Sequence, residues 1–382
     1  MNQGDRKLTR RDFLKNAAQF CALAGISALL PGCGREEATR PASPTAVVAS
    51  PVPTLAAPAT QTVAPTSTQT ATRFEPAYLK LHRTGELSER ARELWALMAE
   101  CQLCPRRCKV NRLKGMSGFC RTPGATLVIS AYHAHFGEER PLVGSEGSGT
   151  IFLTHCNLRC VFCQNWTISH LGRGVETDIE TFAQMMLELQ ADGCHNINIV
   201  TPTHYSPHIL KALDIAAARG LHIPIVYNTS GWERVEILKV LDGIVDIYLP
   251  DFKYWDSEMA ARFSAGADSY PEVTRQAILE MHRQVGVAKP NAEGILERGV
   301  IIRHLVMPNN VGGSEQVMEW IAENLPKDTY VNIMVQYTPL HKAYDYPEIS
   351  RRITREEYLK VVQRAKELGL TNLDIQGYYW LK

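Results

Sequence analysis

Three cysteines stand close together near the middle of the chain, at Cys156, Cys160 and Cys163. Their intervals of three and two residues allow one loop to bring all three thiolates to one point, which suits a cubic [4Fe–4S] cluster. A fully ligated cubane usually takes four thiolates, so three leave one iron free to bind a small molecule. The alternative is a zinc knuckle or a pair of buried thiols, for which a Cys-x2-Cys pair alone is common.

A second set of cysteines comes earlier in the chain and has four members, Cys101, Cys104, Cys108 and Cys120. Four thiolates within twenty residues make a closed site for zinc or for a second [4Fe–4S] cluster, without a free coordination position for a substrate. Lys and Arg residues between and beside these cysteines would offset the negative charge of such a centre. Two disulfides are the third interpretation, and spacing does not separate zinc from iron–sulfur.

The chain after residue 149 alternates short apolar runs with helical patterns. We predict strands at 150–154, 197–201, 223–227, 244–249, 300–306 and 330–335, and helices at 181–191, 207–219, 233–241, 273–285, 315–324 and 355–368. Six strands that alternate with helices predict a parallel α/β sheet, open or partly closed. Ligands of such sheets bind at the carboxyl ends of the strands, and Cys156 comes directly after the first of them.

The Cys-x3-Cys-x2-Cys motif, with Phe162 before its last cysteine and in the first loop of an α/β barrel, resembles that of radical S-adenosylmethionine (SAM) enzymes. The resemblance implies a partial (β/α)6 TIM-like barrel, preceded here by a small cysteine-rich domain. It also implies that the open iron chelates SAM and that one electron cleaves SAM to methionine and a 5′-deoxyadenosyl radical. Phe162 is expected beside the adenine, or alternatively as a plain core aromatic.

Within this superfamily, residues 101–382 most resemble proteins similar to pyruvate formate-lyase activating enzyme. The stretch Asn228-Thr229-Ser230-Gly231 stands where these activases carry Asp-Thr-Asn-Gly, and Asp251-Phe252-Lys253 matches their Asp-x-Lys. The resemblance implies contacts with SAM at Asn228, Asp251, Lys253 and His341, the last of these near the nucleoside. Each of the four is alternatively a helix cap or a satisfied polar residue.

One stretch departs from the superfamily pattern. The run after the second predicted strand, residues 200–205, lacks the Gly-Gly-Glu that holds the methionine amino group of SAM in most of the superfamily. Thr201, Thr203 or His204 is expected to make that contact instead.

The activase resemblance implies an oxidoreductase that abstracts hydrogen from a glycine of a glycyl-radical enzyme. It also implies a low-potential electron donor of flavodoxin or ferredoxin type as a partner. Two alternatives stay open: a radical SAM enzyme that modifies a small molecule or a cell-envelope component, and a membrane-anchored iron–sulfur electron carrier. The formal net charge of +1, from 41 Lys and Arg against 40 Asp and Glu, argues against nucleic acid as the main partner.

The first 73 residues differ in composition from the rest. Residues 1–33 combine a basic start containing Arg10 and Arg11, an uncharged apolar stretch and Cys33, and resemble a twin-arginine export signal with a lipidation site at Cys33. Residues 34–73 are rich in Pro, Thr and Ala and predict a disordered tether. We therefore expect an exported lipoprotein anchored on the extracytoplasmic face of a membrane, with a cytoplasmic protein as the alternative. A cysteine-cluster domain at 74–147 and a radical SAM barrel at 148–382 would follow.

Overall fold

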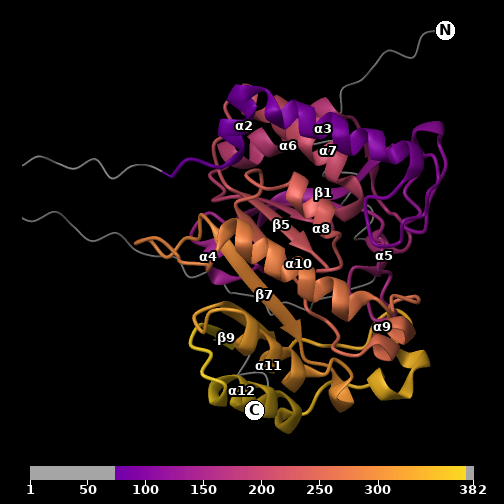
Figure 1. Cartoon of the computed structure of the whole chain (residues 1–382), viewed down its shortest axis with the longest axis vertical. Helices are drawn as coiled ribbons and strands as arrows, with labels where there is room; N and C mark the ends of the chain where they lie inside the picture. Colours follow the sequence, from indigo (N-terminus) through magenta and orange to yellow (C-terminus); the bar gives the residue numbers. More distant parts are fainter. Residues whose placement is uncertain (1–73, 376–382) are drawn as a thin grey trace, which may run out of the picture. The chain divides into compact units, whose positions relative to one another are not determined.

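Seven parallel strands form the centre of the fold in the computed structural model, which describes residues 74–375 (Figure 1). The sheet has the order β3-β1-β2-β4-β5-β6-β7-β8-β9, in which β1 runs antiparallel to both of its neighbours. The strands are β1 (Leu127–His135), β2 (Ser148–Leu153), β3 (Val175–Thr177), β4 (Ile197–Val200), β5 (Ile225–Thr229), β6 (Ile247–Pro250), β7 (Gly299–Leu305), β8 (Tyr330–Met334) and β9 (Leu373–Ile375). The edges β3 and β9 leave the sheet unclosed, so the predicted partial TIM-like barrel is confirmed.

Helices between the strands cover the outer face of the sheet, as Figure 1 shows. Their buried side chains recur every three or four residues, as in α10, which places one apolar stripe against the strands. The helices among residues 74–375 are α2 (Tyr78–Thr84), α3 (Glu86–Ala96), α4 (Arg140–Val143), α5 (Trp166–Ser169), α6 (Ile179–Ala191), α7 (Ser206–Ala218), α8 (Val235–Val240), α9 (Ser257–Phe263), α10 (Tyr270–Val285), α11 (Ser314–Asn324) and α12 (Arg355–Glu367).

All six predicted strands and the six predicted helices between and after them are present, with ends displaced by a few residues. Three strands were not predicted. Two of them, β3 and β9, are only three residues long, so they carry too few positions to show a period. The third, β1, has a register shift between Ile129 and Ala131 that interrupts its alternation.

Residues 74–147 are joined to the barrel by packing as well as by the chain. They supply α2 and α3, which pack on α7, and β1, which pairs with β2. The boundary that we placed between a cysteine-cluster domain at 74–147 and a barrel at 148–382 stays a prediction.

The side chains on the inner face of the sheet change from apolar to polar toward the carboxyl ends of the strands. Val226, Leu249 and Ile301 belong to a buried apolar cluster contributed by neighbouring strands. Two residues further along the same strands or just after them come Asn228, Asp251 and Arg303. Because side chains two apart in a strand point to the same face, the apolar core continues directly into a polar group at the carboxyl ends.

The ends of β5 and β6 are fixed to each other at close range. The Tyr270 hydroxyl lies 2.8 Å from the carbonyl oxygens of both Ser230 and Asp251 and accepts a hydrogen bond from Lys253 N at 2.9 Å. Gly231 lies in the same turn with a φ of +81°, and a Cβ on it would lie 2.1 Å from Asp251 O. This close approach requires glycine at position 231.

The structure corrects the predicted location on the extracytoplasmic face of a membrane. The segments on which that prediction rested, residues 1–33 with Cys33 and the tether at 34–73, lie outside the described residues. Among residues 74–375, no helix has the length and apolar character needed to cross a membrane. Export by the twin-arginine route and a lipid anchor at Cys33 therefore have no support from the structure.

We expect Gly231→Ala to be far more destabilising than Gly220→Ala. Both glycines have positive φ values, +81° and +97°, but a Cβ at Gly220 has nothing within 4 Å. The backbone strain is thus shared, while only Gly231→Ala forces a clash with Asp251 O. Urea unfolding should show that Gly231→Ala loses about 2 kcal/mol more stability than Gly220→Ala. Equal losses would contradict the close approach.

Candidate active site

Cys156, Cys160 and Cys163 lie in the loop that connects β2 to α5. Two residues of this loop, His155 and Arg159, have left-handed φ values of +65° and +55°, which turn the chain sharply around the thiols. The loop is tied to the rest of the fold by backbone hydrogen bonds, among them Val161 N to Phe263 O at 2.8 Å. All three cysteines line the same cavity, at the carboxyl end of the first parallel strand.

Each of the three sulfurs has a polar hydrogen within reach. The contacts are Leu158 N to Cys156 Sγ at 3.3 Å, Ser264 Oγ to Cys160 Sγ at 3.1 Å, and Ser169 Oγ with Cys163 Sγ at 3.1 Å. A thiolate or a metal-bound sulfur accepts such hydrogen bonds, and they influence the reduction potential of a cluster. The surroundings of the three cysteines therefore suit sulfur in its anionic, ligating form.

Burial and the nearby Lys253 ammonium have opposite effects on the pKa values of these three thiols. Burial raises the pKa of all three, and that of Cys160 to about 12, whereas the nearby Lys253 ammonium lowers each of them. Without further positive charge the thiols would stay protonated at neutral pH. A bound metal centre supplies that charge, since it deprotonates the thiols that coordinate it.

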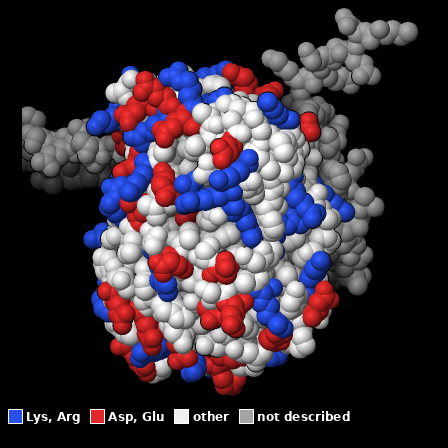
Figure 2. All heavy atoms as spheres, turned by 45° about the vertical axis from the view of Figure 1, so that its right-hand side comes forward, with Lys and Arg blue, Asp and Glu red and all other residues white. Residues whose placement is uncertain are grey.

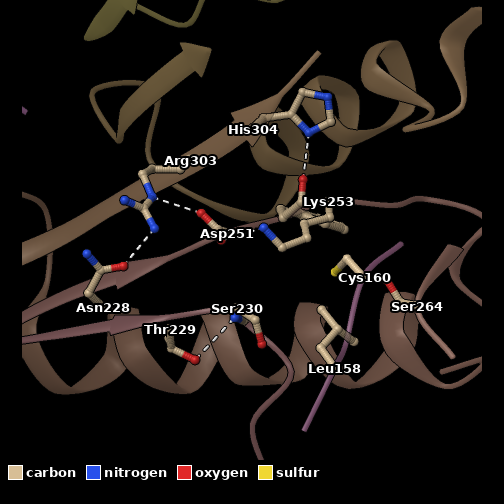
Figure 3. A network of polar contacts seen from close by, with 12 residues as sticks. Leu158, Cys160, Asn228, Thr229, Ser230, Asp251, Lys253, Ser264, Arg303 and His304 are labelled. Carbon is tan, nitrogen blue, oxygen red and sulfur yellow. Dashed lines mark hydrogen bonds and ion pairs between the residues drawn. The ribbon is translucent and has the colours of Figure 1, made fainter. Parts of the chain in front are cut away.

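The wall opposite the cysteines carries a buried network of charges (Figure 3). Arg303 on β7 donates from Nε to Asp251 Oδ1 at 2.8 Å and from Nη2 to Asn228 Oδ1 at 2.7 Å. Lys253 Nζ donates to the other oxygen, Asp251 Oδ2, at 2.6 Å. Burial opposes ionisation of Asp251, but Arg303 and Lys253 outweigh it and hold its pKa below the ordinary value. Asp251 is therefore a carboxylate placed between two cations.

The cavity between these walls has a volume of about 260 Å³. Two polar atoms of its lining residues, Ser230 Oγ and Arg159 Nη1, are buried and have no hydrogen-bond partner among the described residues. Buried donors and acceptors are nearly always paired, so these atoms indicate room for a polar ligand. The predicted site residues that line the cavity are Cys156, Cys160, Phe162, Cys163, Thr201, Asn228, Asp251 and Lys253.

Two predicted ligand contacts lie elsewhere. Thr203 is buried behind the cavity, where its hydroxyl donates to Glu233 Oε1 at 2.5 Å. His341 stacks on Trp166, with ring centroids 5.3 Å apart and an angle of 13° between the planes. Neither is among the residues that line the cavity. His341 nevertheless adjoins the cysteine loop, because the next residue, Lys342, donates its N–H to Val161 O at 2.9 Å.

Sequence reasoning missed Arg303, Ser264 and Ser169. Arg303 had a visible signal, since it is a lone charged residue within the apolar run 300–306 and so requires a partner if the strand is buried. The two serines had none, because a serine in a helix or at its end has many ordinary roles. Only their distances to sulfur single them out.

The second set of cysteines forms a group of its own in the segment after α3. Cys101, Cys104 and Cys120 are buried and Cys108 is half-buried, and all eight cysteines among residues 74–375 are free thiols. The two-disulfide interpretation is therefore not what this structure shows. Within the same residues, no three His, Cys, Asp or Glu side chains converge closely enough to hold a single metal ion.

A sequence profile of the radical SAM superfamily matches residues 150–289. An uncharacterized protein of Methanocaldococcus jannaschii is 35% identical over 284 residues, which are 72% of this chain and 76% of that protein. This chain belongs to the radical SAM superfamily. A second uncharacterized protein of the same organism is 24% identical to this radical SAM chain over 288 residues, covering 69% of the chain and 79% of that protein.

Solved structures were compared as well. The crystal structure of a radical SAM methyltransferase from Sphaerobacter thermophilus matches with a TM-score of 0.38 and 15% identity, over 57% of this chain and 64% of that one. Membership of the radical SAM superfamily implies a [4Fe–4S] cluster and SAM as cofactors. The donor set fits the cluster, because three cysteines line one cavity and each sulfur has a hydrogen-bonding group beside it.

We expect Asp251→Asn to lower the free energy of unfolding by about 3 to 5 kcal/mol, because it leaves Lys253 buried without its counter-charge and leaves Arg303 with a more distant ion pair, to Glu138 at 3.5 Å. Removing one cation as well, in Asp251→Asn/Lys253→Met, should restore part of the loss. Asp256→Asn is the matched control, since Asp256 is an exposed helix cap and Asn caps equally well. Urea unfolding of the four proteins measures this, and a double variant no more stable than Asp251→Asn would contradict the proposed charge balance.

Proposed function

We propose that this protein cleaves SAM reductively at a [4Fe–4S] cluster held by Cys156, Cys160 and Cys163, and that the resulting radical activates a glycyl-radical enzyme. The observation that carries the first part is the single cavity lined by these three cysteines and by polar residues from the ends of β5, β6 and β7. Three cysteines leave one coordination position of a cubane open to SAM. When bound, the cluster supplies the electron that splits SAM into methionine and a 5′-deoxyadenosyl radical.

The charged wall suits the two ends of the amino-acid part of SAM. Lys253 Nζ has three hydrogens, of which Asp251 takes one, so it can also donate to a carboxylate. Asp251 and Asn228 present oxygen atoms suited to an ammonium group, and Arg303 holds both of them in position. Thr201 lines the cavity with a φ of +62° and is our candidate for the contact that Gly-Gly-Glu makes elsewhere in the superfamily.

The nucleoside contacts rest on aromatic residues. Phe162 lines the cavity, and its ring packs against Tyr254 and Tyr337 at centroid distances of 6.3 and 5.8 Å. These neighbours fix the ring orientation, so a contact between the ring and an adenine would cost little side-chain entropy. His341, stacked on Trp166 beside the cysteine loop, is our second candidate for a nucleoside contact.

The choice of a protein substrate rests on the activase resemblance, which is carried by Asn228-Thr229-Ser230-Gly231 and Asp251-Phe252-Lys253. We therefore favour a glycine of a glycyl-radical enzyme as the hydrogen donor, and a flavodoxin- or ferredoxin-type protein as the source of the one electron.

We expect Cys156→Ala, Cys160→Ala and Cys163→Ala each to abolish 5′-deoxyadenosine formation and to remove about 4 iron atoms per chain. Cys194→Ala is the matched control, because Cys194 is a buried cysteine that does not line the cavity and should leave both quantities unchanged. Chromatography of the products after reduction with dithionite and iron analysis of anaerobic protein provide the two measurements. Cleavage of SAM by any of the three variants would refute the site.

The glycyl-radical assignment needs its own experiment. We expect the reduced wild-type protein with SAM to produce a glycyl radical, visible by electron paramagnetic resonance, on a glycyl-radical enzyme encoded by the same organism. Cys156→Ala should produce none. If SAM is cleaved but no candidate enzyme acquires a radical, the substrate assignment fails while the SAM chemistry stands.

A further inference from the structure

The four cysteines of the second set are brought together by the backbone of their own segment. Cys101 N donates to Val110 O at 2.9 Å and Lys109 N donates to Cys101 O at 3.0 Å, which closes a loop around Cys104 and Cys108. Lys109 directly follows Cys108 and has a left-handed φ of +57°. Arg121 directly follows Cys120 and has a φ of +64°, so the chain turns sharply after both cysteines.

The cysteines of this set lie in one compact segment. Cys101, Cys104 and Cys120 are buried and Cys108 is half-buried, and Lys109 N and Arg107 N donate to the carbonyl oxygens of Cys101 and Cys104 at 3.0 and 3.1 Å. Phe119 N donates to Cys108 Sγ at 3.3 Å, and Thr122 Oγ1 lies 3.1 Å from Cys120 Sγ. Clustered buried thiols with hydrogen-bonding groups at the sulfur are typical of a metal centre.

A zinc ion and a [4Fe–4S] cluster hold four sulfurs at different spacings. Zinc draws four sulfurs to about 2.3 Å from its centre, so that they lie roughly 3.8 Å from one another. A cubane separates its thiolates more widely, because each binds a different iron.

Arg106 connects the second set to the first. It follows Cys104 by two residues, and its guanidinium donates to Asn157 O at 3.1 Å and to Ser264 O at 3.2 Å. Asn157 adjoins Cys156, and the Ser264 hydroxyl donates to Cys160 Sγ. The guanidinium also lies 3.8 Å from the centre of the Phe119 ring, which holds it beside the second set.

Further cations lie on the surface of the same segment. Figure 2 brings this side of the molecule forward and shows Lys and Arg side chains gathered on its upper half. Those of this segment that are exposed are Arg107, Lys109, Lys114 and Arg121. Their charge offsets the negative charge of a tetrathiolate centre.

We propose that Cys101, Cys104, Cys108 and Cys120 hold a second [4Fe–4S] cluster, fully ligated by protein, and that Arg106 lies between it and the first cluster as a shared counter-charge. A fully ligated cubane has no open iron for SAM, so this centre differs in role from the first. The presence of the second cluster does not depend on the proposed substrate or on SAM cleavage. The effect of Arg106 rests on the first cluster proposed above.

Metal analysis of anaerobically reconstituted full-length protein tests the second cluster. We expect about 8 iron and 8 sulfide per chain in the wild type, and about 4 of each in both Cys104→Ala and Cys156→Ala. Cys194→Ala should keep all 8. About 4 iron with one zinc in the wild type, or about 4 iron without zinc, would overturn the second cluster and leave the proposed function intact. The wild-type count decides the matter even if Cys104→Ala fails to fold.

The reduction midpoint of the first cluster tests the role of Arg106. We expect Arg106→Leu to shift it to more negative potential in an electron paramagnetic resonance titration, because removing a nearby, half-buried positive charge destabilises the reduced, more negative state. Arg106→Lys keeps the charge and should shift it less. Arg107→Leu is the matched control, since Arg107 is exposed and its nearest charge partner is Glu236 at 3.9 Å. Equal shifts in Arg106→Leu and Arg107→Leu, or none in either, would overturn the shared counter-charge.

Discussion

Compensation of buried charge at the carboxyl edge of the sheet is the constraint on which the rest of this structure depends. Asp251 is enclosed between Arg303 and Lys253, and Lys253 in turn faces Cys160. The ion pairs of Asp251 thus extend from the strand ends toward the cysteine loop. Removal of Asp251 would leave Lys253 buried without its ion-pair partner, which is costlier than never having had the pair.

The sheet positions these charged side chains through the alternation of side chains along each strand, in which every second residue points to the same face. Leu249 and Asp251 share one side of the same segment, as do Ile301 and Arg303 on the next strand. The apolar members hold the strands together, and the polar members two positions later face the cavity at fixed distances from one another. The same strands therefore supply the apolar core and the side chains of the cavity. A shift of register by one residue would turn the apolar residues away from the core and the polar residues away from the cavity.

The sequence predicted the parts of this site that have a local signature. Strands 197–201 and 300–306 stood out because β-branched runs between helices are unmistakable, and Cys156, Cys160 and Cys163 because one loop can unite them. It did not predict that Thr203 turns away to Glu233, since that hydrogen bond joins residues from two different strand ends. Contacts of this kind are determined by tertiary packing, and the spacing of residues along the sequence does not predict them.

The backbone hydrogen bond from Lys342 to Val161 has a consequence for how the protein comes to be assembled. It joins the cysteine loop at the start of the barrel to a segment beyond β8, near the end of the chain, and Gln164 makes a similar contact with the carbonyl of Gln336. Contacts between residues so far apart in the sequence are expected to form late in folding, because closing a long loop costs entropy before the contact stabilises it. The cysteine loop therefore lacks these two contacts until the segment beyond β8 has been synthesised, which leaves an interval in which iron and sulfide can reach the thiols.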